Sequence, residues 1–343
     1  MRSIIVAWNK GDEVAFERHV PLLFNARRNR IIGSSKSFDL VFLEGMDKLS
    51  DKYKAVLSSS GYVLHDASVI YASLCDRYRN LERFGNYERN CFLRWLVIHQ
   101  YFGNVPFIHY DGDVVFNETP EVLEAAFEGL TFILQGCPAL TCVNDPSWLP
   151  RYTEQLDLFY NAMESYSHVA WMKRAEYVHD FKEKNGCLWD RELISSDQDL
   201  LQYTTLAGYL PQDSAATVNS RCGLALFQNP IRIARDIALP LPLTYERRNG
   251  IDYIGGCKVA LWHMQSSFCD YMGYADYRKR LLVRGRTFEH ERPRPPLYFS
   301  YRIFRRLSPL YERLALYERY FSDGKDLSFL LNDKTYWQPG VFF

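Results

Sequence analysis

The sequence contains no apolar run long enough to cross a membrane. Its longest nearly uncharged apolar stretch, residues 130–143, includes Gln135, Gly136 and Pro138 and is shorter than the ~20 residues that a membrane-spanning helix needs. We expect no secretory leader either, because the apolar run at residues 4–8 is shorter than the ~7–15 residues of a signal-peptide core. We therefore expect a globular, cytoplasmic protein whose mature chain begins at its own first strand.

The chain also has no excess of either charge, with 41 basic and 41 acidic residues. Surfaces that hold duplex nucleic acid are strongly basic, so we expect no nucleic-acid partner. The eight cysteines form no C-x-x-C pair, which excludes the spacing of a zinc ribbon and favours reduced thiols in the cytosol. The sequence shows neither P-loop nor dinucleotide spacing among its glycines.

What the sequence does contain is an alternation of short apolar runs with longer helical patterns. This alternation is typical of an α/β protein with a mostly parallel sheet covered by helices. Strands are predicted at residues 3–8, 38–43, 62–65, 105–110, 131–134 and 258–262, and helices at 12–28, 48–57, 87–102 and 121–127. A loop is expected at 135–149, with further helices starting at Pro150 and after the capping residues Ser195, Ser196 and Asp197.

Two aspartates, Asp111 and Asp113, directly follow the predicted strand 105–110. The carboxyl ends of strands are where open α/β sheets bind ligands, and Gly112 lets the backbone turn so that both carboxylates can face one divalent cation. Such oxygen ligands suit Mg²⁺ or Mn²⁺, with a substrate diphosphate completing the coordination. The alternative is an ordinary strand-ending turn, because Asp-Gly is common turn chemistry.

At these residues the chain resembles a known family, the GT-A-fold glycosyltransferases, which hold the diphosphate of a nucleotide-sugar donor through a D-x-D metal site. The resemblance spans about residues 3–265, and the layout is similar to glycosyltransferase family 8. It is carried by I-I-V-A-W-N at 4–9, Y-V-L-H-D at 62–66, F-I-H-Y-D-G-D-V-V-F at 107–116, D-Q-D at 197–199 and His263. It implies an α/β, Rossmann-like, mostly parallel sheet flanked by helices.

The resemblance also implies roles for individual residues. The residues that it places at the nucleotide-sugar donor are Ala7, Trp8, Asn9, Asp66, Arg94, Asp111 and Gly112. The metal site that it implies, for Mn²⁺ or Mg²⁺, consists of Asp111, Asp113 and His263. It also implies a helix start that faces the transferred sugar and carries the catalytic residues, which are Asp197, Gln198 and Asp199.

Some of these residues have a plainer interpretation. Arg94 would instead form a salt bridge between helix and strand end, with Glu88 or Asp66. Residues two apart diverge on a helix, so Asp197 and Asp199 cannot both face one sugar, and one of them is expected to be a cap. If Asp197 is the N-cap, its carboxylate accepts hydrogen bonds from backbone N–H groups and its pKa is depressed.

The function expected from this combination is metal-dependent transfer of a sugar from a nucleotide-sugar, with UDP the favoured nucleotide, to a glycan or lipid-linked glycan acceptor. Residues 1–270 form the predicted catalytic domain, with a nucleotide-sugar half at about 1–116 and an acceptor half at about 117–270. Two alternatives stay open. One is a sugar-phosphate nucleotidyltransferase, although residues 9–12 match its glycine-rich basic loop poorly, and the other is a non-catalytic carbohydrate-binding protein on a transferase-like fold.

The remaining residues, 271–343, are predicted to form a basic and aromatic helical extension. Between Arg278 and Arg306 ten basic residues stand against two acidic ones, and aromatic side chains interleave with the arginines. Such a segment can lie on an anionic membrane surface, which would place the protein on the cytoplasmic membrane face with a lipid-linked acceptor. The alternatives are a terminal helix packed on the catalytic domain and, more remotely, binding of single-stranded nucleic acid.

Overall fold

The computed structural model describes residues 1–13, 16, 20, 22–116, 118–133, 138–177, 194–213, 225–229, 232–233, 245–248, 251–254 and 257–263. The predictions for the extension at 271–343 lie outside these residues. In the described part of the chain, no helix combines the length and the apolar character that crossing a membrane requires. Cys75, Cys91 and Cys142 are free thiols.

The main sheet has the strand order β3-β2-β1-β4-β7-β6. Its strands are β1 (Arg2–Trp8), β2 (Phe38–Glu44), β3 (Tyr62–Asp66), β4 (Phe107–Tyr110), β6 (Phe132–Ile133) and β7 (Leu140–Val143). The first four are mutually parallel, whereas β7 is antiparallel to both β4 and β6. The chain therefore has the predicted α/β fold with a mostly parallel sheet.

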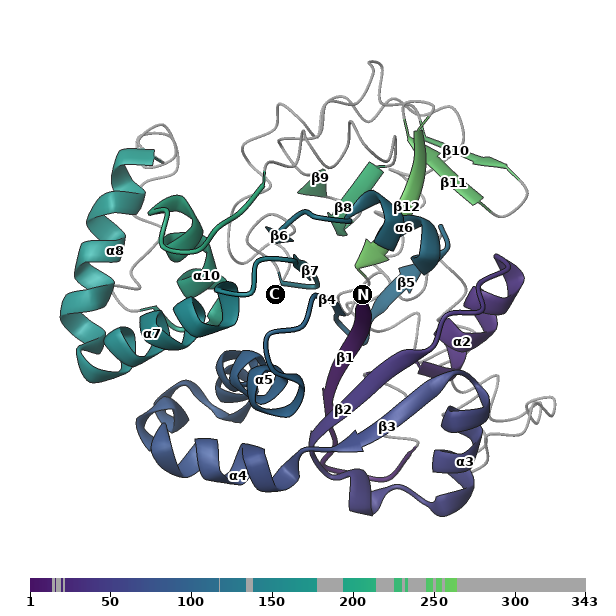
Figure 1. The fold of residues 1–343 in the computed structure, drawn as a ribbon, viewed down its shortest axis with the longest axis horizontal. Helices are drawn as coiled ribbons and strands as arrows, with labels where there is room; N and C mark the ends of the chain where they lie inside the picture. The colour runs from purple at the N-terminus through teal and green to yellow at the C-terminus, as the bar shows by residue number, and fades with distance from the viewer. Residues whose placement is uncertain are drawn as a thin grey trace, which may run out of the picture.

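Apolar side chains alternate along β1 and contribute to two cores, one on each face of the sheet. Ile5 and Ala7 pack into the core that includes residues of α2 (Leu22–Ile31), α3 (Asp51–Ser59) and α6 (Pro120–Ala126). Ile4 and Val6 pack into the core that includes residues of α4 (Ser68–Arg77), α5 (Asn86–Phe102), α7 (Trp148–Asn161), α8 (Met163–Tyr177) and α10 (Asp197–Leu206). Figure 1 shows helices α2 and α3 on one side of the sheet and α4 and α5 on the other. Because both faces are covered, the strand is apolar throughout its centre.

The structure contains a second sheet, and its first strand in the sequence follows β4. Its strands are β5 (Val114–Phe116), β8 (Ala225–Asn229), β9 (Arg232–Ile233), β10 (Tyr245–Arg248), β11 (Ile251–Ile254) and β12 (Cys257–His263). Strand β12 confirms the strand predicted at 258–262. It pairs antiparallel with β5, and the register places His263 opposite Val114. The pairing therefore brings the end of a distant strand next to the residue that follows Asp113.

The prediction of a loop at 135–149 is wrong at its centre, where β7 lies. Leu140, Cys142 and Val143 are at most 3% exposed, and β7 pairs along the whole length of β4. The prolines and asparagines on either side of this short apolar run hid the strand. Helices α4 and α8 were not predicted either, although the buried residues Ala67, Tyr71, Leu74 and Tyr78 follow helical spacing along α4.

Candidate active site

The strand order of the main sheet reverses between β1 and β4. From β1 the sheet continues through β2 to β3 on one side, and β4 is added on the other side. Because these strands are parallel, their carboxyl ends share one edge, and open α/β sheets bind ligands where the strand order reverses. Trp8 ends β1 and Asp111 follows β4. Both residues therefore lie at the place where such sheets bind ligands.

Residues 111–114, called here the D-G-D turn, fold back immediately after β4. The Val114 N–H donates to the Asp111 carbonyl at 3.1 Å, and the Asp111 N–H donates to the carbonyl of Ala139 at 2.9 Å. Gly112 is required by close packing, because a Cβ at this position would lie 2.3 Å from Cγ1 of Val20. The turn places the Asp111 and Asp113 side chains in a partly exposed position.

Arg94, on α5, connects the D-G-D turn to the start of α10. Its Nη1 donates to Asp111 Oδ1 at 2.7 Å, and its Nη2 and Nε donate to Asp197 Oδ2 at 2.7 and 3.1 Å. The residue is 4% exposed. Burial opposes its charge, but Asp197 and Asp111 hold the pKa of Arg94 well above its ordinary value. The structure thus brings three of the predicted site residues into one charged cluster.

The salt bridge of Arg94 with Asp66 is not formed. Asp66, at the end of β3, accepts a hydrogen bond from the backbone N–H of Ser68 at 2.9 Å instead, and its side chain is exposed. It remains at the carboxyl edge of the sheet, where a nucleotide-binding role was predicted.

The expected capping residues of α10 were Ser195, Ser196 and Asp197, and the alternative in which Asp197 is the N-cap is wrong. Ser196 is the N-cap, and its Oγ accepts from the backbone N–H of Asp199 at 3.3 Å. Asp199 in turn accepts from the backbone N–H of Ser195 at 3.1 Å, so it belongs to the capping group. Gln198 is exposed.

Asp197 turns inward instead of capping the helix. Only 1% of the residue is exposed, and the indole Nε1 of Trp95 donates to its Oδ2 at 3.1 Å. Burial raises the pKa of Asp197, while the Arg94 ion pair and the Trp95 hydrogen bond act in the opposite direction. The depressed pKa expected for a capping carboxylate is therefore also corrected.

His109, two residues before Asp111 on β4, is part of the cluster and was not predicted. It is fully buried, its ring lies 5.0 Å from that of Trp95, and its Nε2 is 3.8 Å from Asp111 Oδ1. Burial and the neighbouring Arg94 charge lower the pKa of His109 to about 3, so the imidazole is neutral. The sequence signal was its spacing, since residues two apart on a strand share a face.

The predicted donor-binding residues of β1 differ in how they are placed. Ala7 is 1% exposed, so only its backbone can meet a ligand. Asn9 is also buried, and its side chain donates to the carbonyl of Gly11 at 2.7 Å. Trp8 meets Tyr87 of α5 edge-to-face at 5.5 Å between ring centroids. Tyr87, which was not predicted, is 64% exposed and adds an accessible aromatic ring at this edge.

The donor atoms at the D-G-D turn suit a hard divalent cation. Asp111 and Asp113 offer carboxylates from one turn, and the backbone of His263 lies opposite Val114, the next residue along. The side chain of His263, the predicted third ligand, lies outside the part of the structure that is described. Among the described side chains, no group of three or more His, Cys, Asp or Glu is gathered for a metal. Oxygen atoms of a substrate diphosphate would have to complete the coordination, as is usual for Mg²⁺ and similar ions.

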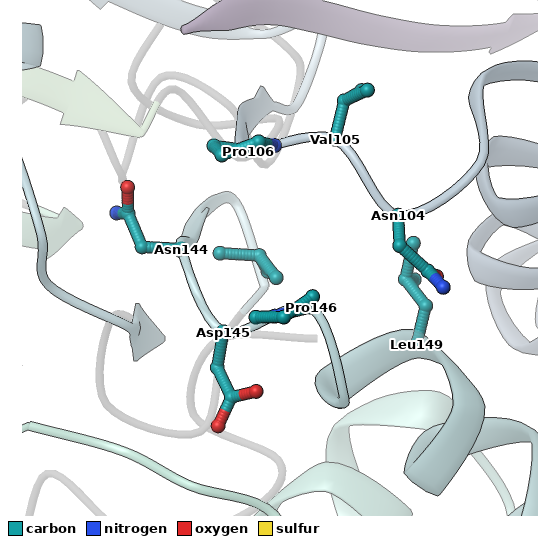
Figure 2. A pocket seen from close by; sticks show the side chains of 8 residues that line it. Asn104, Val105, Pro106, Asn144, Asp145, Pro146 and Leu149 are labelled. Atoms are coloured by element: carbon teal, nitrogen blue, oxygen red, sulfur yellow. The ribbon is translucent and has the colours of Figure 1, made fainter.

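A shallow depression lies at the opposite edge of the sheet (Figure 2). It is lined by residues 104–106, which lead into β4, by residues 144–146, which leave β7, and by Leu149 of α7. Since β7 is antiparallel to β4, these segments meet at the amino end of β4. The depression is therefore at the other end of β4 from Asp111 and does not belong to the candidate site.

Neither a protein-family model nor a curated protein matches the sequence. Among solved structures, the chain is similar to the apo form of mouse xyloside xylosyltransferase 1, with 12% sequence identity and a TM-score of 0.37. The similarity covers 63% of this chain and 85% of that one. The function proposed below rests on the geometry of the site.

Proposed function

We propose that this protein is a metal-dependent glycosyltransferase that moves a sugar from a nucleotide-sugar, with UDP as the favoured nucleotide, to a hydroxyl of a glycan or glycolipid. The observation that supports this most is the D-G-D turn, which presents two carboxylates at the carboxyl edge of a parallel sheet, beside the point where strand order reverses. Mn²⁺ or Mg²⁺ bound there would neutralise the charge that develops on the departing diphosphate.

The residues of the chain have separate parts in this proposal. Asp113 and Asp111 hold the cation, with His263 as a third ligand. Arg94 fixes the Asp111 carboxylate by a charge-assisted hydrogen bond of 2.7 Å. Trp8 stacks with the nucleobase at the end of β1, since an aromatic ring there offers a flat apolar surface.

In this proposal Asp197 orients Arg94 and does not transfer a proton. Its Oδ2 already accepts three hydrogen bonds, two from Arg94 and one from Trp95. A general base must instead reach the proton that it removes, within hydrogen-bond distance of the substrate. Gln198 and Asp199, at the same helix start, are the proposed contacts to the transferred sugar.

We further propose that the acceptor is reached at the cytoplasmic membrane face through the basic segment 278–306. Its ten basic and two acidic residues would attract anionic lipid, by about 1 kcal/mol for each basic residue near the surface. Sedimentation with anionic vesicles tests this. Binding that weakens in high salt and is lost after truncation at Pro295 supports the proposal, and equal supernatant fractions for both chains contradict it.

Release of free nucleotide from donor sugars tests the main proposal. UDP-, GDP- and CMP-sugars are incubated with the protein and Mn²⁺, and again with EDTA. We expect one donor to release its nucleotide only with metal, and the release to be lost in Asp113→Asn. A parallel reaction with a nucleoside triphosphate and a sugar 1-phosphate covers the alternative: pyrophosphate release there, with intact donors in the first reaction, would identify a nucleotidyltransferase.

A further inference from the structure

The buried side chain of Asn25, on α2, forms hydrogen bonds with the backbone of the D-G-D turn. The amide Nδ2 of Asn25 donates to the Val114 carbonyl at 2.9 Å and to the Gly112 carbonyl at 3.3 Å. Asn25 is 4% exposed, and it lies 87 and 89 residues before its two partners in the sequence. Both hydrogens of the amide are thus directed at the turn that carries Asp113.

The two contacts lie on either side of Asp113. One is made to the residue before it and the other to the residue after it, whose N–H closes the turn by donating to the Asp111 carbonyl. Val20, just before α2, packs over the same turn, because it occupies the space that a Cβ on Gly112 would need. The segment around α2 therefore fixes both the backbone path and the packing of the turn.

The carbonyl oxygen of the Asn25 amide makes no corresponding contact. Its Oδ1 is buried and has no hydrogen-bond partner among the described residues. An unsatisfied buried oxygen lowers stability, so Oδ1 does not itself stabilise the fold. Its clear contribution is the pair of hydrogen bonds donated to the turn.

We infer that Asn25 is a positioning residue for the D-G-D turn, and that it sets the direction in which Asp113 is presented to a divalent cation. The role towards the cation rests on the function proposed above. Asn25 touches neither donor nor metal, and it acts through the backbone on both sides of Asp113.

The test compares Asn25→Leu with Asn29→Leu in the full chain. Asn29 is a matched control, because it is a buried asparagine on the same helix, one turn later, also with an unpartnered Oδ1 among the described residues. Leucine keeps the number of heavy atoms and the branching at Cγ, and it removes the amide hydrogens. Asn25→Asp, which keeps the shape and removes the same hydrogens, serves if the leucine variant does not fold.

The first readout is independent of metal and donor. Hydrogen–deuterium exchange of the peptide covering 110–116 should become about tenfold faster in Asn25→Leu. The loss of two ordinary hydrogen bonds should favour local opening of the turn by about this factor. Asn29→Leu should leave it unchanged. Unchanged exchange in Asn25→Leu, or equal acceleration in both variants, overturns the assignment even if the protein proves to be no glycosyltransferase.

The second readout is the affinity for Mn²⁺ alone, followed by the electron paramagnetic resonance of the free ion. We expect binding to weaken about tenfold in Asn25→Leu, because the same local equilibrium presents the ligand, and to stay at the wild-type value in Asn29→Leu. Faster exchange with unchanged Mn²⁺ affinity overturns the positioning role. A wild-type protein that binds no Mn²⁺ contradicts the proposed function instead, and the exchange measurement still decides whether Asn25 holds the turn.

Discussion

The chain contains one pattern twice, D-G-D at 111–113 and D-Q-D at 197–199, and folds it in two ways. At 111–113 the backbone is a turn, and both aspartates are partly exposed at the edge of the sheet. At 197–199 the backbone is the first turn of α10. There the aspartates separate, with Asp197 1% exposed against Arg94 and Asp199 bonded to Ser195.

This difference shows that the spacing of carboxylates does not by itself define a site. Residues two apart on a helix point about 200° away from each other, so a helical D-x-D serves two separate purposes. A turn with a glycine at its centre can keep both side chains on one side. The two triplets nevertheless meet, because Arg94 binds one aspartate of each.

The largest expected difference between the triplets is in activity. Asp113→Asn should reduce donor hydrolysis about a thousandfold, since a bound cation contributes several kcal/mol to stabilising the departing charge. Asp199→Asn should reduce it far less, because Asp199 mainly caps α10. Initial rates at saturating donor and Mn²⁺ measure both. Equal losses in the two variants would contradict the assignment of the metal site to the turn.

The next largest effect is expected when Arg94, the common partner of the two triplets, is removed. Arg94→Leu leaves Asp197 buried without its ion pair, which should lower the free energy of unfolding by about 3–5 kcal/mol. Urea unfolding measures this, with Arg83→Leu, an exposed arginine of the preceding segment, as the control. The double variant Arg94→Leu/Asp197→Leu should recover most of the loss, and failure to recover would show that the cluster contributes to stability in another way.

The central residues of the triplets should differ as well. Gly112→Ala places a Cβ 2.3 Å from Val20 Cγ1, and overpacking of this kind costs about 1–3 kcal/mol. Gln198→Ala, at an exposed helical position, should change stability by less than about 0.5 kcal/mol. Thermal unfolding compares them. Val20→Ala should relieve the Gly112→Ala variant, and a lack of relief would mean that the contact with Val20 is not what makes Gly112→Ala destabilising.

The parts of the fold that could be predicted from the sequence depend on local signals. The apolar runs of β1 to β4 and the Asp-Gly pair after β4 are written in consecutive residues, so the parallel sheet and the D-G-D turn follow from them. The N-cap of α10 stayed open among Ser195, Ser196 and Asp197, because serine and aspartate are equally good capping types. Local preference cannot choose between them, and the burial of Asp197 against Arg94 decides.

The contacts that complete the candidate site could not be predicted, because they join segments far apart in the chain. Arg94 and Asp197 are separated by 103 residues, and Asn25 and Val114 by 89. A single sequence carries no signal of such pairs. His109 gave a weak signal through its spacing from Asp111, but an apolar strand with a histidine is also compatible with a core residue.

The outer aspartate of the helical triplet should have a smaller effect than Asp113, Arg94 or Gly112. Asp199→Ala removes a carboxylate that accepts from the Ser195 N–H at 3.1 Å and lies in the first turn of α10, so the free energy of unfolding should fall by about 0.3–1 kcal/mol. Part of this loss comes from the interaction of the charge with the helix dipole, and it should shrink in high salt. Urea unfolding at low and high salt measures this loss. Ser196→Ala is the control, because it removes a neutral cap and its loss of stability should not depend on salt. A loss as large as that of Arg94→Leu would mean that Asp199, like Asp197, is part of the buried charge cluster, and the division of the helical triplet between cap and cluster would be wrong.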